Sequence, residues 1–426
     1  MNTILLIWKT KDLRWKIAMV IILLLCTRIL VHIPIPGINV SGLQAFFQGN
    51  QFLNLLDIFS GGGLTNFSIA MLGVGPYITA SIIMQLLTMI VPSLKDLQKE
   101  SGEAGRAKIN QYTRFLTIPL AVLSGFGTIR LLESQGGAAI LGAFSPFQWF
   151  LTLLSIAAGT MLVMWIGEII SEYGIGNGLS LIIFAGIIAR LPGSLRSLVE
   201  LYDPSKLPMV IGFVAGIILV IAAVILVTEA QRNIPVTYAK RMRGDKQVGG
   251  VDSHLPMRLN QAGVIPIIFA LSLMLFPAII AQFFVNAKTA SIAHFAQSAI
   301  NFTNNQNIWY GVAYFALVVA FTYFYTNIVV NPDEVAENMQ RGGGFIPGLR
   351  PGQQTASYLY KVLNRITLPG SIFLGLIAIL PFLVRHWTGT QSLSLGGTGL
   401  LIVVSVVIET IKQVEAQLTM HDYKGY

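Results

Sequence analysis

Residues 207–228 read LPMVIGFVAGIILVIAAVILVT and carry no charged side chain. The hydrocarbon core of a bilayer is about 30 Å thick, and roughly 20 apolar residues in an α-helix cross it. Nine further apolar runs lie at 17–33, 67–91, 115–129, 147–167, 175–189, 261–285, 307–330, 366–384 and 393–408. We therefore predict an all-α polytopic membrane protein with about ten transmembrane helices. The third, fifth and tenth runs are short, so we expect their helices to extend into the flanking segments.

The composition of the 426 residues agrees with this prediction. Apolar residues make up 54% of the chain and charged residues 11%, and the mean hydropathy is +0.68. Soluble domains carry about 25% charged residues. A soluble fold of this length could not cover its surface with so few charges, so part of the surface must face lipid.

The basic residues are unevenly distributed between the two sides of the predicted spans. If the N-terminus is cytoplasmic, that side carries the N-terminal segment, the loops 92–114, 229–260 and 331–365, the turn at 171–174 and the C-terminal tail. These segments hold 21 of the 28 lysines and arginines. Cytoplasmic loops of membrane proteins are enriched in both residue types. We therefore predict that both termini are cytoplasmic.

Three of the predicted spans share a high content of helix-breaking residues: Gly73, Gly75 and Pro76 in the second, Gly263, Pro266 and Pro277 in the seventh, and Gly174, Gly176 and Gly178 beside the fifth. Such residues interrupt backbone hydrogen bonding, which a bilayer tolerates only where protein or a water-filled cavity satisfies the freed groups. Close helix packing through small residues would explain each one singly. Their clustering indicates helices that line a cavity or must hinge.

Catalytic and energy-coupling motifs are missing from the sequence. It contains no His-x-x-x-His, no Cys-x-x-Cys and no phosphate-binding glycine-rich loop. We therefore predict a protein that is not an enzyme, that needs no cofactor or metal and that takes its energy from a partner. The main alternative is a secondary transporter with broken helices. That class places polar groups at the breaks, whereas valine, isoleucine and leucine flank the breaks here.

Few ionisable residues fall within the runs or directly beside them. Arg28 and His32 lie near the outer end of the first run, and Glu168 and Glu409 lie near cytoplasmic ends of others. Long polar side chains near a helix end can extend along the helix to water. We expect this behaviour of all four.

Residues 56–64, LDIFSGGGL, form an apolar segment on the predicted external side, just before the second span. The segment is too short and too rich in glycine to cross a bilayer. An interfacial or re-entrant segment is one interpretation. A mobile element packed into a cavity is the other, and the sequence leaves both open.

Two polar loops carry the remaining candidate sites. Residues 231–243, QRNIPVTYAKRMR, place branched residues in alternation before a basic tip, which predicts a β-hairpin projecting into the cytosol. The charge of this loop either sets the topology or docks an acidic or RNA-rich partner. Residues 341–352, RGGGFIPGLRPG, have a turn-rich backbone that suggests a shaped, exposed contact surface.

Six motifs occur in order along the chain: IPIPG at 33–37, GPYITASIIMQLL at 75–87, QYTR at 111–114, GIGNG at 174–178, AGVIP at 262–266 and FIPGLRPG at 345–352. Through them the chain resembles the SecY/Sec61-alpha family of protein-conducting channels, essentially from end to end. The resemblance implies two pseudo-symmetric five-helix halves around an hourglass pore. The N-terminal half would be 1–190, with spans one to five, and the C-terminal half 191–426, with spans six to ten.

The resemblance also implies roles for individual residues. A pore ring would consist of Val74, Ile78, Leu179, Ile183, Ile268 and Ile402, with Val74 and Leu179 standing where family members often have isoleucine. A plug near 57–67 would include Asp57, Ile58, Phe59, Ser60, Gly61, Gly62, Gly63 and Leu64. A lateral gate between spans two and three and spans seven and eight would involve Gln85. A narrow ring of branched apolar side chains dewets when it is empty and resists ions.

The partners expected from the resemblance are a motor and accessory subunits. Lys240, Arg241 and Arg243 in the first loop and Arg350 in the second would dock the ribosome or the motor ATPase SecA. A SecE subunit would clamp the halves, and a SecG subunit is also expected. The chain would pass unfolded polypeptides with signal sequences across the bacterial inner (plasma) membrane and release hydrophobic segments laterally into the lipid bilayer.

Overall fold

The structure, a computed structural model, is built mainly from long helices. It describes residues 10–36, 43, 57, 60–100, 102–133, 145–200, 207–238, 241–243, 246–248, 252–285, 289–302, 308–388 and 397–424. Ten helices within these ranges overlap the ten apolar runs: α2 (Lys11–Val31), α5 (Gly75–Ile90), α7 (Gly102–Leu132), α9 (Pro146–Tyr173), α10 (Gly178–Glu200), α11 (Leu207–Glu229), α12 (Ile265–Phe284), α14 (Ile308–Val329), α16 (Gln353–Thr388) and α17 (Gly397–Lys424).

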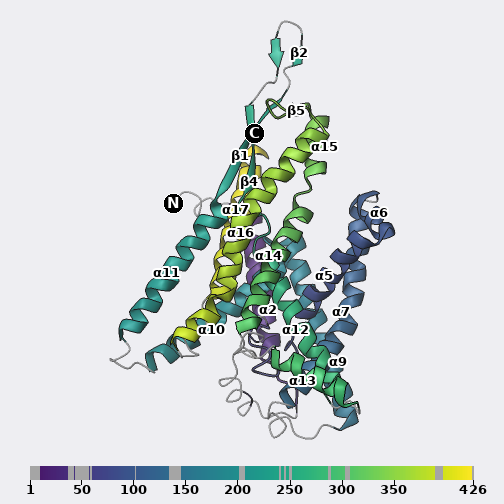
Figure 1. The fold of residues 1–426 in the computed structure, drawn as a ribbon, viewed down its shortest axis with the longest axis vertical. Helices are drawn as coiled ribbons and strands as arrows, with labels where there is room; N and C mark the ends of the chain where they lie inside the picture. Colours follow the sequence, from purple (N-terminus) through teal and green to yellow (C-terminus); the bar gives the residue numbers. More distant parts are fainter. Residues whose placement is uncertain are drawn as a thin grey trace.

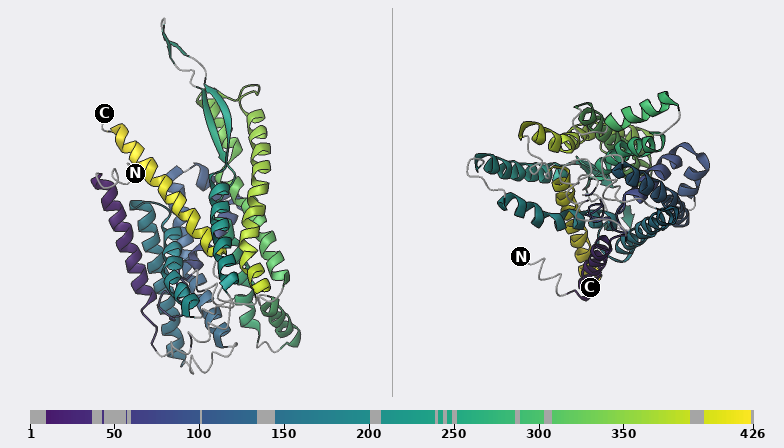
Figure 2. Two further views of the ribbon diagram at one scale, coloured as in Figure 1. Left: turned by 90° about the vertical axis from the view of Figure 1, so that its left-hand side faces the viewer. Right: turned by 90° about the horizontal axis from the view of Figure 1, so that it is seen from below.

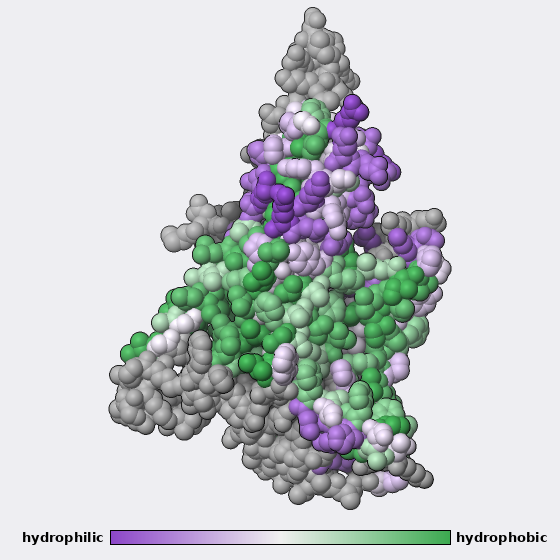
Figure 3. Space-filling view, viewed as in Figure 1, coloured by the Kyte–Doolittle hydropathy of each residue, from purple (hydrophilic) through white to green (hydrophobic). Residues whose placement is uncertain are grey.

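The long helices run roughly along the longest axis of the molecule and form one body (Figure 1). Apolar residues cover a broad belt across the middle of this body, and hydrophilic residues gather at the end from which strands project (Figure 3). The start of α2 and the end of α17 both lie toward that same end (Figure 2). By length and composition, three helices among the described residues can cross a membrane, at Pro146–Tyr173, Ile308–Arg341 and Gln353–Val384, and four other apolar helices are shorter.

The helix bounds confirm one prediction and correct another. The helices α7, α10 and α17 extend well beyond the short third, fifth and tenth runs, as expected. The second run was predicted to be helical from residue 67, but α5 begins only at Gly75. Gly73 adopts a φ of 52°, a left-handed conformation that suits glycine. Pro76 then occupies the first turn of α5, where its missing N–H costs no helical hydrogen bond.

Residues 60–74 therefore form a series of turns inside the helical body, and we call them the turn segment. Its buried side chains Leu64, Phe67 and Met71 belong to an apolar cluster with Ile129 of α7 and Ile156 of α9. The turn segment is part of neither a helix nor a sheet. The apolar cluster holds it against α7 and α9.

Two of the predicted loops contain more regular structure than their sequences indicated. The loop 92–114 is helical: α6 (Pro92–Glu100) is followed by the first turns of α7. The loop 331–365 contains α15 (Pro332–Arg341), the short strand β5 (Gly344–Phe345) and the beginning of α16. A further helix, α13 (Ala290–Phe302), lies between α12 and α14 in the sequence.

The loop 229–260 forms the predicted β-hairpin. Strand β1 (Gln231–Tyr238) pairs antiparallel with β4 (Asp252–Arg258), with Gln231 opposite Arg258 and Thr237 opposite Asp252. Beyond them, β2 (Arg241–Arg243) pairs with β3 (Lys246–Val248) and projects furthest from the helical body (Figure 1). The all-α prediction therefore holds for the helical body, and the described strands lie at the projecting end.

The hairpin and the 331–365 region are joined in one unit, which the sequence did not indicate. Strand β5 adds to the free edge of β1, giving the strand order β4-β1-β5. Ile234 of β1 and Met257 of β4 lie in one buried cluster with Ala336 of α15 and Leu359 of α16. The two regions therefore share a small hydrophobic core at the projecting end.

The ionisable residues within the runs behave differently from one another. His32 and Glu409 are exposed, in line with the expectation. Glu168 accepts a hydrogen bond from Arg114 Nε at 2.8 Å, so it is held in an ion pair between α9 and α7. Arg28 extends to the turn segment, where its contacts form part of the site.

Helix α9 passes so close to the turn segment that only glycine fits at the contact. A Cβ atom placed on Gly159 would lie 2.0 Å from the backbone oxygen of Ile69. A Cβ atom placed on Gly311, which lies within α14, would have no neighbouring atom within 4 Å. The two glycines therefore form a matched pair, one in close contact with the backbone and one in open space.

We predict that Gly159→Ala destabilises the protein by about 1–3 kcal/mol, because the added methyl group forces α9 and the turn segment apart. Gly311→Ala should leave stability unchanged or raise it slightly, because alanine favours helices over glycine. Thermal unfolding of the two purified variants in detergent measures the difference. Equal unfolding midpoints would show that α9 and the turn segment do not pack as described.

Candidate functional site

The six aliphatic residues expected to form a ring come from four helical regions that meet in the centre of the body. Val74 caps the start of α5, Ile78 lies in its first turn, Leu179 and Ile183 lie in α10, Ile268 in α12 and Ile402 in α17. Five of them are buried, Leu179 is partly buried, and all belong to one central apolar cluster. The structure therefore gathers residues that are far apart in the sequence.

A cavity of about 80 Å³ lies where these residues converge. Val74, Ile78, Ile183 and Ile268 line it. Ile402 and Leu179 belong to the same cluster but are not among the lining residues, and Leu179 packs over Gly167 of α9. Ser60 and Leu64 of the turn segment form part of the same cavity wall. Four of the ring candidates therefore share one space with the segment expected to be the plug.

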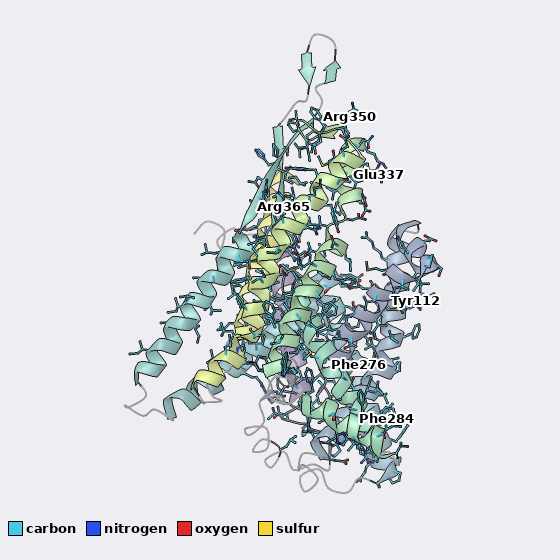
Figure 4. All side chains as sticks on the ribbon, viewed as in Figure 1. Tyr112, Phe276, Phe284, Glu337, Arg350 and Arg365 are labelled. Carbon is cyan, nitrogen blue, oxygen red and sulfur yellow. The ribbon has the colours of Figure 1, made fainter. Side chains whose placement is uncertain are left out.

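Helices α5, α7 and α12 supply most of the remaining wall. Thr79 of α5, Ser124 and Thr128 of α7, and Leu271, Ser272 and Phe276 of α12 line the cavity. Helix α12 packs against both α5 and α7. Figure 4 shows Phe276 within the helical body, far from the projecting end where Arg350 lies. The cavity thus lies beside the seam between the second and third apolar helices and the seventh.

Gln85 of α5, expected at a lateral gate, does not line this cavity. It lies about 10 Å along the helix from Ile78, at 1.5 Å per residue. Its Nε2 donates to Ser81 Oγ at 3.3 Å, whereas its buried Oε1 has no hydrogen-bond partner among the described residues. Of the two polar atoms of the Gln85 side chain, therefore, Nε2 has a hydrogen-bond partner and Oε1 has none among the described residues.

The backbone of the turn segment is hydrogen-bonded to the chain that follows α2. Ile35 N donates to Phe67 O at 2.9 Å, and Ile69 N donates to Ile33 O at 3.1 Å. Phe67 is completely buried and has a φ of 43°, which is rare for a residue with a side chain. These two bonds satisfy backbone groups that no helix satisfies.

Asp57 precedes the turn segment and is completely buried. Its Oδ1 accepts hydrogen bonds from Thr65 N at 2.8 Å and from Ser60 Oγ at 3.2 Å. Its Oδ2 contacts Thr65 Oγ1 and forms an ion pair with Arg190 Nη2 of α10. Arg190 also donates to Thr65 Oγ1 at 3.1 Å. Both carboxylate oxygens are therefore held by charged or polar donors.

Arg28 of α2 holds the same region from another side. Its Nη1 donates to the carbonyl oxygen of Gly61 at 2.7 Å. A Cβ atom at Gly61, whose φ is 68°, would lie 3.0 Å from that guanidinium and 3.3 Å from the Cα of Gly186. The space and the backbone conformation both require glycine at this position. Arg28 was expected to extend to water, and it instead binds the backbone of the expected plug.

The sequence placed Asp57 and Thr65 only within the plug range 57–67 and did not identify Arg190 as part of the site. Arg190 and Thr65 are 125 residues apart. One local signal was present, because Asp57 is an acidic residue in an otherwise apolar stretch, and a buried acid usually has a cationic partner. The remaining plug candidates Ile58 and Phe59 lie outside the described residues.

The expected docking residues lie at the projecting end. Arg350 is exposed, follows β5 and lies at the same end as Glu337 of α15 (Figure 4). Its carbonyl oxygen accepts a hydrogen bond from Thr355 Oγ1 at 2.9 Å. Arg241 and Arg243 belong to β2, and Lys240 lies outside the described residues.

A family model and the full-length relatives that resemble this chain all point to one family. A family model described as SecY matches residues 68–411. The protein translocase subunit SecY of Streptomyces galbus is 44% identical over 432 residues and that of Mycobacterium tuberculosis strain ATCC 25618 / H37Rv is 42% identical over 435, each with 98% of both chains covered.

Three solved structures share the fold. One, described as a protein-conducting channel, has a TM-score of 0.62 at 21% identity, covering 94% of this chain and 91% of that one. A SecY structure whose plug domain is described as stabilising the closed state of the translocation channel has a TM-score of 0.61 at 20% identity, covering 93% and 90%. Sec61 in a canine ribosome–channel complex has a TM-score of 0.57 at 20% identity, covering 94% and 91%.

Proposed function

The chain belongs to the SecY family, and we propose from that premise that it is the channel subunit of a protein translocase. It would pass unfolded secretory polypeptides across a membrane and release hydrophobic segments sideways into lipid. The main support for this proposal is the central cavity. Four buried aliphatic residues line it together with Ser60 and Leu64. A constriction of that kind, filled by a removable segment, is what a sealed polypeptide channel needs.

The chemistry of the constriction suits a substrate of any sequence. Val74, Ile78, Ile183 and Ile268 offer only apolar contacts, which are weak and non-directional. A sliding chain therefore meets no site at which it would be held. When the constriction is empty, its apolar walls repel water and ions. Leu179 and Ile402 complete the proposed ring from the same cluster.

The proposed plug lies near 57–67 and so includes Asp57 and the first residues of the turn segment. Its residues Ser60 and Leu64 reach the cavity from one side, so displacing the segment would open a path through the constriction. Its residues 60–67 form turns rather than a helix, so this part of the plug can move without unfolding a helix. The SecY structure whose plug domain is described as stabilising the closed state supports this role.

The proposed lateral gate is the seam where α12 meets α5 and α7. Thr79, Ser124, Thr128 and Ser272, which carry hydroxyl groups, are among the residues that line the cavity beside it. Ser and Thr side chains can form hydrogen bonds across a helix interface within a membrane, so a signal helix that offers polar partners could replace one side. Gln85, whose Oε1 has no hydrogen-bond partner within the described part of the chain, would favour separation of the same helices further along α5.

The proposed setting is the bacterial inner membrane, with both termini and the projecting end in the cytoplasm. The uneven distribution of basic residues and the position of both chain ends toward the projecting end (Figure 2) support this orientation. The halves 1–190 and 191–426 would flank the pore. SecE and SecG subunits are the proposed accessory partners.

The energy for transport would come from a partner that docks on the projecting end, and the chain itself would perform no catalysis. The proposed partners are the motor ATPase SecA and the ribosome. Arg350, Lys240, Arg241 and Arg243 would supply positive charge to the contact, which suits an acidic protein surface or RNA. The ribosome complex of the similar Sec61 channel supports this part of the proposal.

We predict that replacing Ile78 and Ile183 by asparagine raises the resting ion conductance of the reconstituted channel complex at least several-fold, because polar side chains wet the constriction. Ile188→Asn is the matched control, since Ile188 lies on the same helix as Ile183 but is 39% exposed. Planar-bilayer recording of the variants provides the measurement. Unchanged conductance in the Ile78 and Ile183 variants would mean that these faces do not seal a pore.

We predict that Arg243→Glu and Arg350→Glu each slow export of a secretory precursor several-fold while membrane insertion of the channel stays normal. The reversed charge repels the docking partner. Arg106→Glu makes the same charge change on an exposed residue in the first turns of α7, away from the hairpin. Normal export in the first two variants, or equal loss in all three, would contradict a docking site at the hairpin end.

A further inference from the structure

The turn segment and Asp57 are held by two different kinds of contact. One side is apolar, where Leu64, Phe67 and Met71 pack into a hydrophobic cluster. The other side is polar, where Asp57 and Gly61 bind the guanidinium groups of Arg190 and Arg28. The polar contacts come from two helices, α10 and α2, that pack against each other. They therefore tie the segment to the fixed body at two points.

The polar contacts are largely shielded from water, since the Arg190 side chain is 23% exposed. Asp57 is completely buried. The cavity beside Arg28 and Gly61 has a volume of about 10 Å³, about the size of one water molecule. Away from bulk water the attraction between opposite charges is strong, and an unpaired buried charge is strongly unfavourable. Asp57 and Arg190 therefore depend on each other while the segment is seated.

The two arginines converge on the glycine run of the segment. A Cβ atom on Gly62 would lie 3.8 Å from Arg190 Nε and 3.9 Å from Arg28 Nη2. Two like charges are thus brought to one turn, where Arg190 pairs with the Asp57 carboxylate and Arg28 binds the carbonyl oxygen of Gly61. Without the negative charge of Asp57, the two guanidinium groups would repel each other at this turn.

We propose that Asp57, Arg190 and Arg28 form an electrostatic latch that holds the segment seated and sets how strong a signal sequence must be to open the channel. The proposal rests on the channel function proposed above and assigns positioning roles to the two arginines. Hydrogen bonds and ion pairs weaken steeply with distance and misalignment. A displacement of a few ångströms therefore releases the whole set of contacts, and the segment is either seated or free.

The latch also couples release of the segment to opening of the constriction. Ser60 donates to Asp57 and lines the central cavity at the same time. When an entering polypeptide widens that cavity, water reaches the ion pair and screens it, so the contact weakens. Both charged groups regain hydration once they separate. The latch is therefore strong in the closed, dry channel and weak in the open, wet one.

Removing the charge of Asp57 or Arg190 should let the channel open in response to a weakened signal sequence. In the assembled channel complex, we expect Asp57→Asn and Arg190→Gln to raise resting ion conductance. We also expect each to raise export of a precursor with a weakened signal sequence by roughly tenfold. Export of a precursor with an intact signal should stay near the parent rate. The double variant should behave like either single variant, because both changes remove the same interaction.

Two further variants separate the latch from a general loss of stability. Thr65→Val keeps the shape of the side chain and removes the hydroxyl that contacts both Asp57 and Arg190, so we expect a smaller change in the same direction. Arg130→Gln removes one half of an ion pair with Glu133, whose atoms are 2.8 Å apart and whose arginine side chain is 47% exposed. This control should leave both conductance and signal requirement at the parent values.

Parent values of conductance and signal requirement in Asp57→Asn, Arg190→Gln and Thr65→Val would overturn the latch. Additive effects in the double variant would overturn it as well, since they would show that the two residues act separately. If the Asp57→Asn variant does not assemble, the conductance of the Thr65→Val complex provides the test. A value above that of the parent supports the latch, and the parent value overturns it. Failure of the channel function itself is recognised separately, by a parent complex that exports no precursor and by Ile78 and Ile183 variants that do not leak.

Discussion

The structure depends on one constraint, the need to satisfy backbone polar groups of a non-helical segment within an apolar body. In a membrane, irregular backbone is tolerated only where protein or enclosed water supplies hydrogen bonds. Ile33, Ile35 and the Arg28 side chain provide such bonds to the turn segment. Gly159 lets α9 approach the same backbone, and the chain becomes helical again only at Gly75. The surrounding helices are arranged to accommodate this segment.

Two kinds of chemistry meet at this segment and have different consequences. The aliphatic residues around the central cavity make contacts that are weak and independent of direction, which suits sealing around chains of any sequence. Asp57 and its arginine partners make contacts that are strong only in one geometry. On the account proposed here, the apolar contacts determine what may pass, and the polar contacts determine when passage begins.

The helices were predictable from the sequence because hydropathy is a local property. The ten apolar runs and the hairpin of β1 and β4 follow from patterns within a few tens of residues. The start of α5 was misplaced because apolar turn residues look like the beginning of a span. The pairing of β1 with β5 and of Asp57 with Arg190 joins distant parts of the chain. Such contacts are decided by tertiary packing, which no local pattern encodes.

Crosslinking between a translocating polypeptide and the proposed constriction would show whether these buried aliphatic residues line a pore. A photoreactive amino acid would replace Ile183 or Ile268, and a secretory chain would be stalled partway through the assembled complex. We expect crosslinks to the stalled chain from both positions and none from Ile218 of α11, which is 63% exposed. Crosslinks from Ile218 alone, or from none of the three positions, would contradict a pore lined by these buried aliphatic residues.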